Sequence, residues 1–148
     1  MAERSAFVAA SLVLLALLSG SVLVEAETNY ERVTTRDETV ATVAAVELVD
    51  GDVIVAVEVH NTMREPLRVR YVSVVLDRAN ATDSASVPYN GYLKIPAGEA
   101  IVNGSVPARQ TTGTVAPGET FTVRGTVAVE VFNRYRFEIP IEPAEVTV

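Results

Sequence analysis

Residues 53–67 read VIVAVEVHNTMREPL, and their pattern decides the fold. Valine occupies every second position from Val53 to Val59, so in an extended chain the four valines share one face. The side chains between them are mixed in character and share the other face. Turn-forming residues then interrupt the pattern from Asn61, and a new strand begins at Leu67. This alternation predicts an antiparallel sheet with one buried face and one face in solvent.

The chain after residue 38 repeats this pattern of strands and turns. Its aliphatic residues are mostly Val, whose branched side chain favours strands. Strands are predicted at Thr39–Val49, Val53–His60, Leu67–Asp77, Gly91–Ile95, Ala100–Val106, Phe121–Val131 and Tyr135–Ile141. Long polar loops are predicted at residues 78–90 and 107–118. Five long and two short strands indicate an all-β domain, an antiparallel β-sandwich of immunoglobulin or fibronectin III type, with a closed barrel as the second choice.

Residues 67–77 give two different signals. Tyr71 is predicted to face the core together with Leu67 and Val69, because arginines alternate with these three residues. The run 72–76 then has little alternation, which predicts a bulge or burial on both faces.

The N-terminal residues have a different composition. Ser5–Val24 contain no charge and are rich in Leu, and twenty such residues can span the roughly 30 Å hydrocarbon core as a helix. Arg4 predicts that the N-terminus stays inside and that the domain lies outside the cytoplasm. The alternative is a signal peptide cleaved near Ala26, which would release the domain. Residues 1–25 are therefore predicted as a transmembrane anchor or signal peptide, 26–38 as a polar stalk, and 39–148 as the sandwich.

The charge balance is acidic. Residues 27–148 contain 17 acidic residues (19 less Glu3 and Glu25) and 11 basic ones (12 less Arg4), a net charge of −6. This balance argues against nucleic acid or an anionic lipid surface as a partner, since both attract a basic face. Lys94 is the only lysine, and a lysine-poor, Ala- and Val-rich chain is typical of a salt-adapted prokaryote such as a halophilic archaeon. The chain has no Cys, so no disulfide supports the fold.

Catalytic and metal-binding patterns are weak. His60 is the only histidine, and by its position it lies opposite the valines at a strand end, without a neighbouring nucleophile motif. No catalytic residue and no cofactor is predicted, although an enzyme whose site is invisible in sequence stays an alternative. Asp50 and Asp52 flank a glycine and could bind calcium, but hairpin-turn chemistry accounts for both, so no metal is predicted.

Two groups of residues point to the surface. Asn80 and Asn103 each begin a glycosylation sequon, which agrees with export. Five arginines on solvent-facing strand positions are expected to pair with neighbouring acids: Arg68, Arg70, Arg124, Arg134 and Arg136.

The order of strand, Asn61, Pro66-Leu67 and then a strand containing Tyr71 resembles the type-two late embryogenesis abundant family, also called the water stress and hypersensitive response (WHy) domain. The closing segments Val123–Val129 and Tyr135–Ile141 resemble that family as well. Thr62 departs from the family pattern, which has Pro after the Asn. The turns at 96–99 and 116–119 are similar to those of cell-adhesion-related surface domains.

The resemblance implies a non-catalytic, stress-associated or interaction domain, anchored to a membrane through residues 5–24 and lying outside the cytoplasm. A protein partner would bind at loops or at a sheet edge. The candidate loop residues are Val87, Pro88, Tyr89 and Tyr92. The alternative is an accessory subunit of a larger membrane or cell-surface complex, which predicts an apolar patch near Val72, Val74 and Leu76.

Overall fold

The computed structural model describes residues 37–148. The predicted anchor or signal peptide at 1–25 and residues 26–36 of the predicted stalk lie outside the described residues. Residues Glu38–Val148 form one compact unit. No helix in the described part of the chain is long and apolar enough to cross a bilayer.

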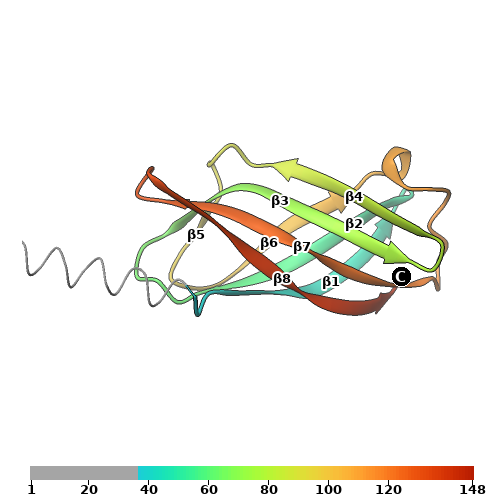
Figure 1. Cartoon of the computed structure of the whole chain (residues 1–148), viewed down its shortest axis with the longest axis horizontal. Helices are drawn as coiled ribbons and strands as arrows, with labels where there is room; N and C mark the ends of the chain where they lie inside the picture. The colour runs from blue at the N-terminus through green and yellow to red at the C-terminus, as the bar shows by residue number, and fades with distance from the viewer. Residues whose placement is uncertain (1–36) are drawn as a thin grey trace, which may run out of the picture. The chain divides into compact units, whose positions relative to one another are not determined.

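The described chain is all-β, as predicted, with one short 3-10 helix (Figure 1). The elements are β1 (Val40–Val49), β2 (Asp52–Asn61), β3 (Leu67–Arg78), β4 (Ala81–Pro88), β5 (Lys94–Ile95), β6 (Gly98–Val106), η1 (Ala108–Gln110), β7 (Thr120–Val131) and β8 (Tyr135–Thr147). The strands form one sheet in the order β4-β3-β7-β8-β1-β2-β6, with β5 paired to β3. The pair β1–β8 is parallel, and the other pairs are antiparallel.

The sheet curls so that its two halves pack against each other. Strands β4 and β6 lie at opposite ends of the strand order but contact each other, and β6 also packs on β3, behind which it passes in Figure 1. The halves are joined by a single parallel pair, Ala41 with Ile141. Pro140 and Pro143 lie in β8 beside this pair and have no N–H to donate. The predicted immunoglobulin or fibronectin III type of sandwich is not confirmed, because the two halves form one continuous curled sheet.

The core lies between the two halves and is built mainly from valines. The side chains of Val53, Val55, Val57 and Val59 are fully buried, so the predicted inner face of this strand is confirmed. The contact between the halves is close at Gly104 of β6. A Cβ atom there would lie 2.3 Å from Cγ2 of Val74, so β6 can approach β3 only because this residue has no side chain.

Three predictions are wrong in this part of the chain. Residues 81–88 form strand β4 rather than part of a polar loop, because their small polar residues pair with β3 along the whole strand. Tyr71 faces outward rather than into the core. The register of β3 against β7 shifts between Val69 and Tyr71, and this bulge turns Val72 inward and Tyr71 outward. The bulge or two-sided burial predicted for the run 72–76 is wrong, because these residues pair regularly with β7 and alternate between buried and half-buried positions, and the bulge lies just before them.

Asn61 fixes the turn between β2 and β3 through its side chain, which is 2% exposed. Its Nδ2 donates to the carbonyl oxygens of Glu65 at 2.9 Å, Pro96 at 3.1 Å and Ile95 at 3.3 Å. Its Oδ1 accepts from the backbone N–H of Met63 at 3.0 Å. One amide thus connects the β2–β3 turn to the end of β5, where these backbone groups have little access to water.

Replacing Asn61 by alanine is expected to lower the free energy of unfolding by about 2–3 kcal/mol, because it leaves buried backbone groups without partners. Urea denaturation of the variant and of the wild type measures this loss. Asn103→Ala is the control, since the Asn103 side chain is exposed on β6 and a change there should stay within about 0.5 kcal/mol. Equal losses in the two variants would contradict the proposed role of the Asn61 amide.

Candidate functional site

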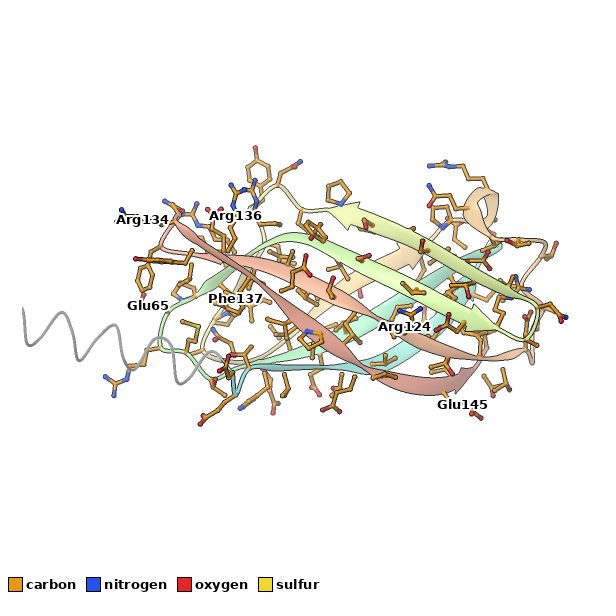
Figure 2. All side chains as sticks on the ribbon, viewed as in Figure 1. Glu65, Arg124, Arg134, Arg136, Phe137 and Glu145 are labelled. Carbon is orange, nitrogen blue, oxygen red and sulfur yellow. The ribbon has the colours of Figure 1, made fainter. Side chains whose placement is uncertain are left out.

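The outer face of β3, β7 and β8 carries a shallow pocket of about 490 Å³. Two arginines, two aromatic side chains, one carboxylate and two small or apolar residues line it: Arg70, Tyr71, Ala128, Val129, Arg136, Phe137 and Glu138. We call it the outer pocket. It lies near the β7–β8 turn, where Figure 2 shows Arg136 and Phe137 close to one end of the sheet.

Tyr71, Ala128 and Glu138 are cross-strand neighbours in the outer pocket. The Tyr71 hydroxyl donates to Oε1 of Glu138 at 2.5 Å, across the intervening strand β7. Ala128 lies between them, and its small side chain leaves room for the two longer ones to meet. The hydrogen bond to Glu138, burial and the negative charge of Glu138 together raise the pKa of Tyr71 above its ordinary value.

The Tyr71 pKa gives a direct test of this contact. In an NMR titration of the ring signals, we expect the pKa of Tyr71 to lie above about 10, and Glu138→Gln to lower it by removing the carboxylate. Glu145→Gln is the matched control on the same strand, because Glu145 is remote from Tyr71 in the register. An unchanged Tyr71 pKa in Glu138→Gln would show that the hydrogen bond is not present in solution.

A second cross-strand row, Arg68–Glu130–Arg136, lies beside the first. Glu130 is only 7% exposed, and its Oε2 accepts from Nε of Arg136 at 2.9 Å. This pair confirms the expected partner of Arg136, and Arg124 likewise pairs with Asp77 at 2.6 Å. Arg68, by contrast, has no ion pair within the described residues.

The Arg70 guanidinium has no hydrogen bond or ion pair within residues 37–148, so its expected pairing with an acid is wrong. It lines the outer pocket together with Arg136, Tyr71 and Phe137. A guanidinium beside an apolar and aromatic wall suits an anion attached to an apolar group. Since Glu138 accepts from the Tyr71 hydroxyl and Arg136 is paired with Glu130, the positive donors of this pocket without a partner in the described residues are those of Arg70.

The loop residues predicted from sequence lie close together along the end of β4 and the segment after it. Val87 and Pro88 are strand residues of β4, half-buried and exposed respectively, whereas Tyr92 is 89% exposed. Tyr89 is half-buried, and its hydroxyl donates to the carbonyl oxygen of Asn103 at 2.5 Å. The Tyr89 hydroxyl thus connects the segment after β4 to β6, and the binding of a partner at these four residues stays a prediction.

The other candidate residues have structural roles or lie at the surface. His60 is exposed near the end of β2, with Nδ1 3.7 Å from Oε1 of Glu99. Asp50 adopts a positive φ in the β1–β2 turn, and Oδ1 of Asp52 accepts from the N–H of Ala108 at 2.8 Å. No group of three His, Asp or Glu side chains in the described residues could hold a metal ion.

The two sequon asparagines are both exposed. Asn80 lies in the β3–β4 turn, and Asn103 lies on strand β6, so their use by a glycosylation enzyme stays a prediction. The apolar residues at which an accessory subunit was expected to show a patch are fully buried in the core: Val72, Val74 and Leu76.

The opposite end of the sheet holds a charged cluster with a structural role. All five N–H groups of Arg78 are used: Nε and Nη2 donate to the carboxylate of Glu119, Nη1 to Asp83, and the remaining two to the carbonyl oxygens of Thr112 and Thr114. This cluster holds residues 111–119 against β3 and β4. The segment was predicted as a solvated loop, but Arg78 fixes it in place.

No protein-family model and no curated protein matches this chain. The solution structure of a late embryogenesis abundant (LEA) protein matches 90% of this chain and 84% of its own length, with a TM-score of 0.54 and 17% identity. A crystal structure described as the ApaA protein from Bordetella pertussis matches 74% of this chain and 94% of its own, with a TM-score of 0.50 and 16% identity. These likenesses show a shared fold, and the LEA-like fold predicted from sequence is confirmed.

The outer pocket was not found by sequence reasoning. Its position depends on the bulge after Val69, which turns Tyr71 outward over Ala128. The signal in the sequence was the change in alternation at Tyr71-Val72, together with an alanine at the matching position of β7.

Proposed function

We propose that this protein is a non-catalytic β domain, anchored to a membrane by residues 5–24 and acting outside the cytoplasm in stress protection or in binding a partner. The observation that carries the proposal is the LEA-like fold across 90% of the chain. The stress-associated role comes from the name of that structural neighbour, and fold likeness supports it only by analogy. The uncharged run Ser5–Val24 supports the anchor.

The described side chains support a binding role over a catalytic one. The most buried acids, Asp83 and Glu130, are each paired with an arginine, so they serve the fold. The unpaired group in the outer pocket is Arg70, whose guanidinium offers hydrogen-bond donors suited to an anion.

Membrane attachment can be tested on the full chain expressed in a bacterial host. We expect the protein to stay in the membrane pellet after alkaline carbonate washing, and protease added to spheroplasts to digest residues 38–148. The control is a chain lacking residues 5–24, which should be soluble in the cytoplasm. Intact N-terminal peptides in mass spectrometry distinguish the anchor from a cleaved signal peptide. Full protection from external protease would contradict the location outside the cytoplasm.

The stress-associated role needs the native host. Cells lacking the gene are expected to survive drying or osmotic upshift less well than the parent, and the full chain should restore survival. Equal survival of the two strains under both stresses would remove this part of the proposal. A stoichiometric protein that co-purifies with the full chain from native membranes would favour the accessory-subunit alternative.

A further inference from the structure

One end of the curled sheet has a surface unlike the rest of the molecule. We call it the proximal end, because β1 begins there. It also includes the β2–β3 turn, the segment between β4 and β5, and the β7–β8 turn. The opposite, distal end has the β1–β2 and β3–β4 turns and η1. Figure 2 shows Arg134, Arg136 and Glu65 at the proximal end, and Arg124 and Glu145 toward the distal end.

The exposed aromatic residues of the described chain all lie at the proximal end. Tyr92 is 89% exposed, Tyr135 is 52% exposed and Phe132 is 40% exposed. Phe132 and Asn133 have φ values of 56° and 55° at the tip of the β7–β8 hairpin. Asn and Gly adopt this conformation readily, whereas a bulky residue is strained there. A bulky residue rarely adopts this conformation, so the exposed Phe132 ring is held at the hairpin tip with backbone strain.

The proximal end also holds positive charges that no carboxylate neutralises. Five cations there have no ion pair within residues 37–148: Arg64, Arg68, Arg70, Lys94 and Arg134. At the distal end, Arg78 and Arg124 are both paired with acids, and Arg109 is unpaired.

The acids of the proximal end have partners of different kinds. Glu130 is paired with Arg136, Glu138 accepts from the Tyr71 hydroxyl, and Glu99 lies 3.7 Å from His60. Glu65, Glu38 and Asp37 are also at this end. The net charge of the chain is −7, but most of the acidic excess belongs to the distal half, where Glu47, Asp50 and Asp52 gather with the acids of the Arg78 and Arg124 pairs.

We propose that the proximal end docks on an anionic lipid surface, with Phe132 and Tyr135 entering the headgroup region and the unpaired arginines binding lipid phosphates. Aromatic rings with an apolar body favour the boundary between lipid and water. Arginine places its apolar stem against acyl chains and its guanidinium among phosphates. The outer pocket adds Arg70 and Arg136 beside two aromatic side chains. The net charge of the chain disfavours an anionic surface, but its charges are unevenly distributed, and the unpaired cations gather mainly at the proximal end.

Connectivity brings this end near a membrane. Fifteen residues, 25–39, separate the uncharged run from the start of β1 at Val40, and they reach at most about 50 Å in any conformation. If residues 5–24 are the anchor, the proximal end is tethered close to a lipid surface, which makes weak contacts effective. The inference thus rests on the proposed function, which supplies the membrane. The proximal end could still fail to contact lipid in a protein whose anchor is inserted.

The absence of tryptophan from the chain allows a clean test on the full-length protein. In the Phe132→Trp variant, a single tryptophan, excited at a wavelength that tyrosine does not absorb, reports the environment of the hairpin tip in vesicles of phosphatidylcholine with anionic phosphatidylglycerol. Val49→Trp is the matched control at the distal end, because Val49 is 47% exposed. Tyr135→Trp is a second reporter for use if the turn does not accept the indole. Vesicles containing brominated lipid quench a tryptophan that enters the headgroup or acyl region.

We expect brominated lipid to quench the reporter at position 132 and to leave that at position 49 unchanged. Adding Arg134→Glu should weaken the quenching, whereas Arg109→Glu, a matched charge reversal at the distal end, should not. Raising the salt from 0.1 to 1 M shortens the Debye length from about 10 to about 3 Å and should weaken the quenching as well. Equal quenching at both ends, or none at either proximal reporter, would overturn the docking. Flotation of the same vesicles shows separately whether residues 5–24 anchor the protein in the bilayer.

Discussion

Replacing Gly125 by alanine is expected to lower the free energy of unfolding by about 3 kcal/mol, one of the two largest effects anticipated for this protein. Gly125 lies in β7 and pairs with both Val74 of β3 and Ile141 of β8. A Cβ atom there would lie 2.0 Å from the carbonyl oxygen of Ser73. The obstacle is backbone inside a hydrogen-bonded ladder, so it cannot move aside as a side chain tip would.

Thermal unfolding measures the effect, with a fall in Tm of about 10 °C or more expected for a domain of this size. Gly98→Ala is the matched control, since Gly98 has a φ of 96° but a methyl group added there would meet no other part of the chain within 4 Å. Gly98→Ala introduces backbone strain but no clash, so it should lower the free energy of unfolding by about 1 kcal/mol. Similar losses of stability in Gly125→Ala and Gly98→Ala would mean that β3 and β7 can move apart at Gly125 without a cost in free energy.

Replacing Arg78 by methionine is expected to lower the free energy of unfolding by a similar amount, about 3 kcal/mol. The guanidinium lies 3.2 Å from Oδ2 of Asp83, whose side chain is 1% exposed, and 2.6 Å from Oε1 of Glu119. Its loss leaves a buried carboxylate without its positive partner. Arg124→Met is the control, because the Arg124–Asp77 pair is largely solvent-exposed and such pairs contribute little. A loss in Arg78→Met no larger than in the control would contradict the structural role of the cluster.

The pH dependence of the Arg78→Met variant gives a second readout. Burial alone would raise the pKa of Asp83, but hydrogen bonds from Thr112 and Arg78 outweigh burial and lower it. The hydrogen bond from Arg78 is the main cause that lowers the pKa of Glu119. A carboxyl group with a lowered pKa in the folded state stabilises the fold above its unfolded pKa of about 4, and this stabilisation is lost as the pH falls through the folded pKa. The difference in stability between wild type and Arg78→Met should therefore shrink as the pH falls from 7 to about 3. If the difference in stability between the two proteins stayed constant over this range, the loss of stability in Arg78→Met would come from lost packing and not from lost charge interactions.

The strands could be predicted from the sequence where one face of the strand is apolar. Alternating valines from Val53 to Val59 and the similar pattern of Phe121–Val131 fixed which side chains enter the core, since residues two apart share a face. Strand β4 was missed because its inward positions are small or polar. Asp83 points inward there, where Arg78, five residues earlier, and Thr112, 29 residues later, donate to its carboxylate.

The candidate site was harder to predict because it depends on register. A bulge of one residue reverses the side of every following side chain, and no local rule states where it falls. The unpaired state of Arg70 depends on which strands are neighbours, since Glu130 pairs with Arg136 and Glu138 with Tyr71. The predicted strand ends at Val131 and Tyr135 located the β7–β8 hairpin, but they did not predict the positive φ of Phe132, because the turn contains no Gly to mark it.

The pairing of the first strand with the last has a consequence during synthesis. Ala41 of β1 meets Ile141 of β8, so the contact that joins the two halves links residues 100 positions apart. A chain emerging from a ribosome or a translocation channel can form β1–β2 early, but it cannot close the sheet until its final strand is free. Until then the core valines of the early hairpin stay partly uncovered. A chain shortened before β8 would remain open to proteases and to self-association, however complete the preceding strands are.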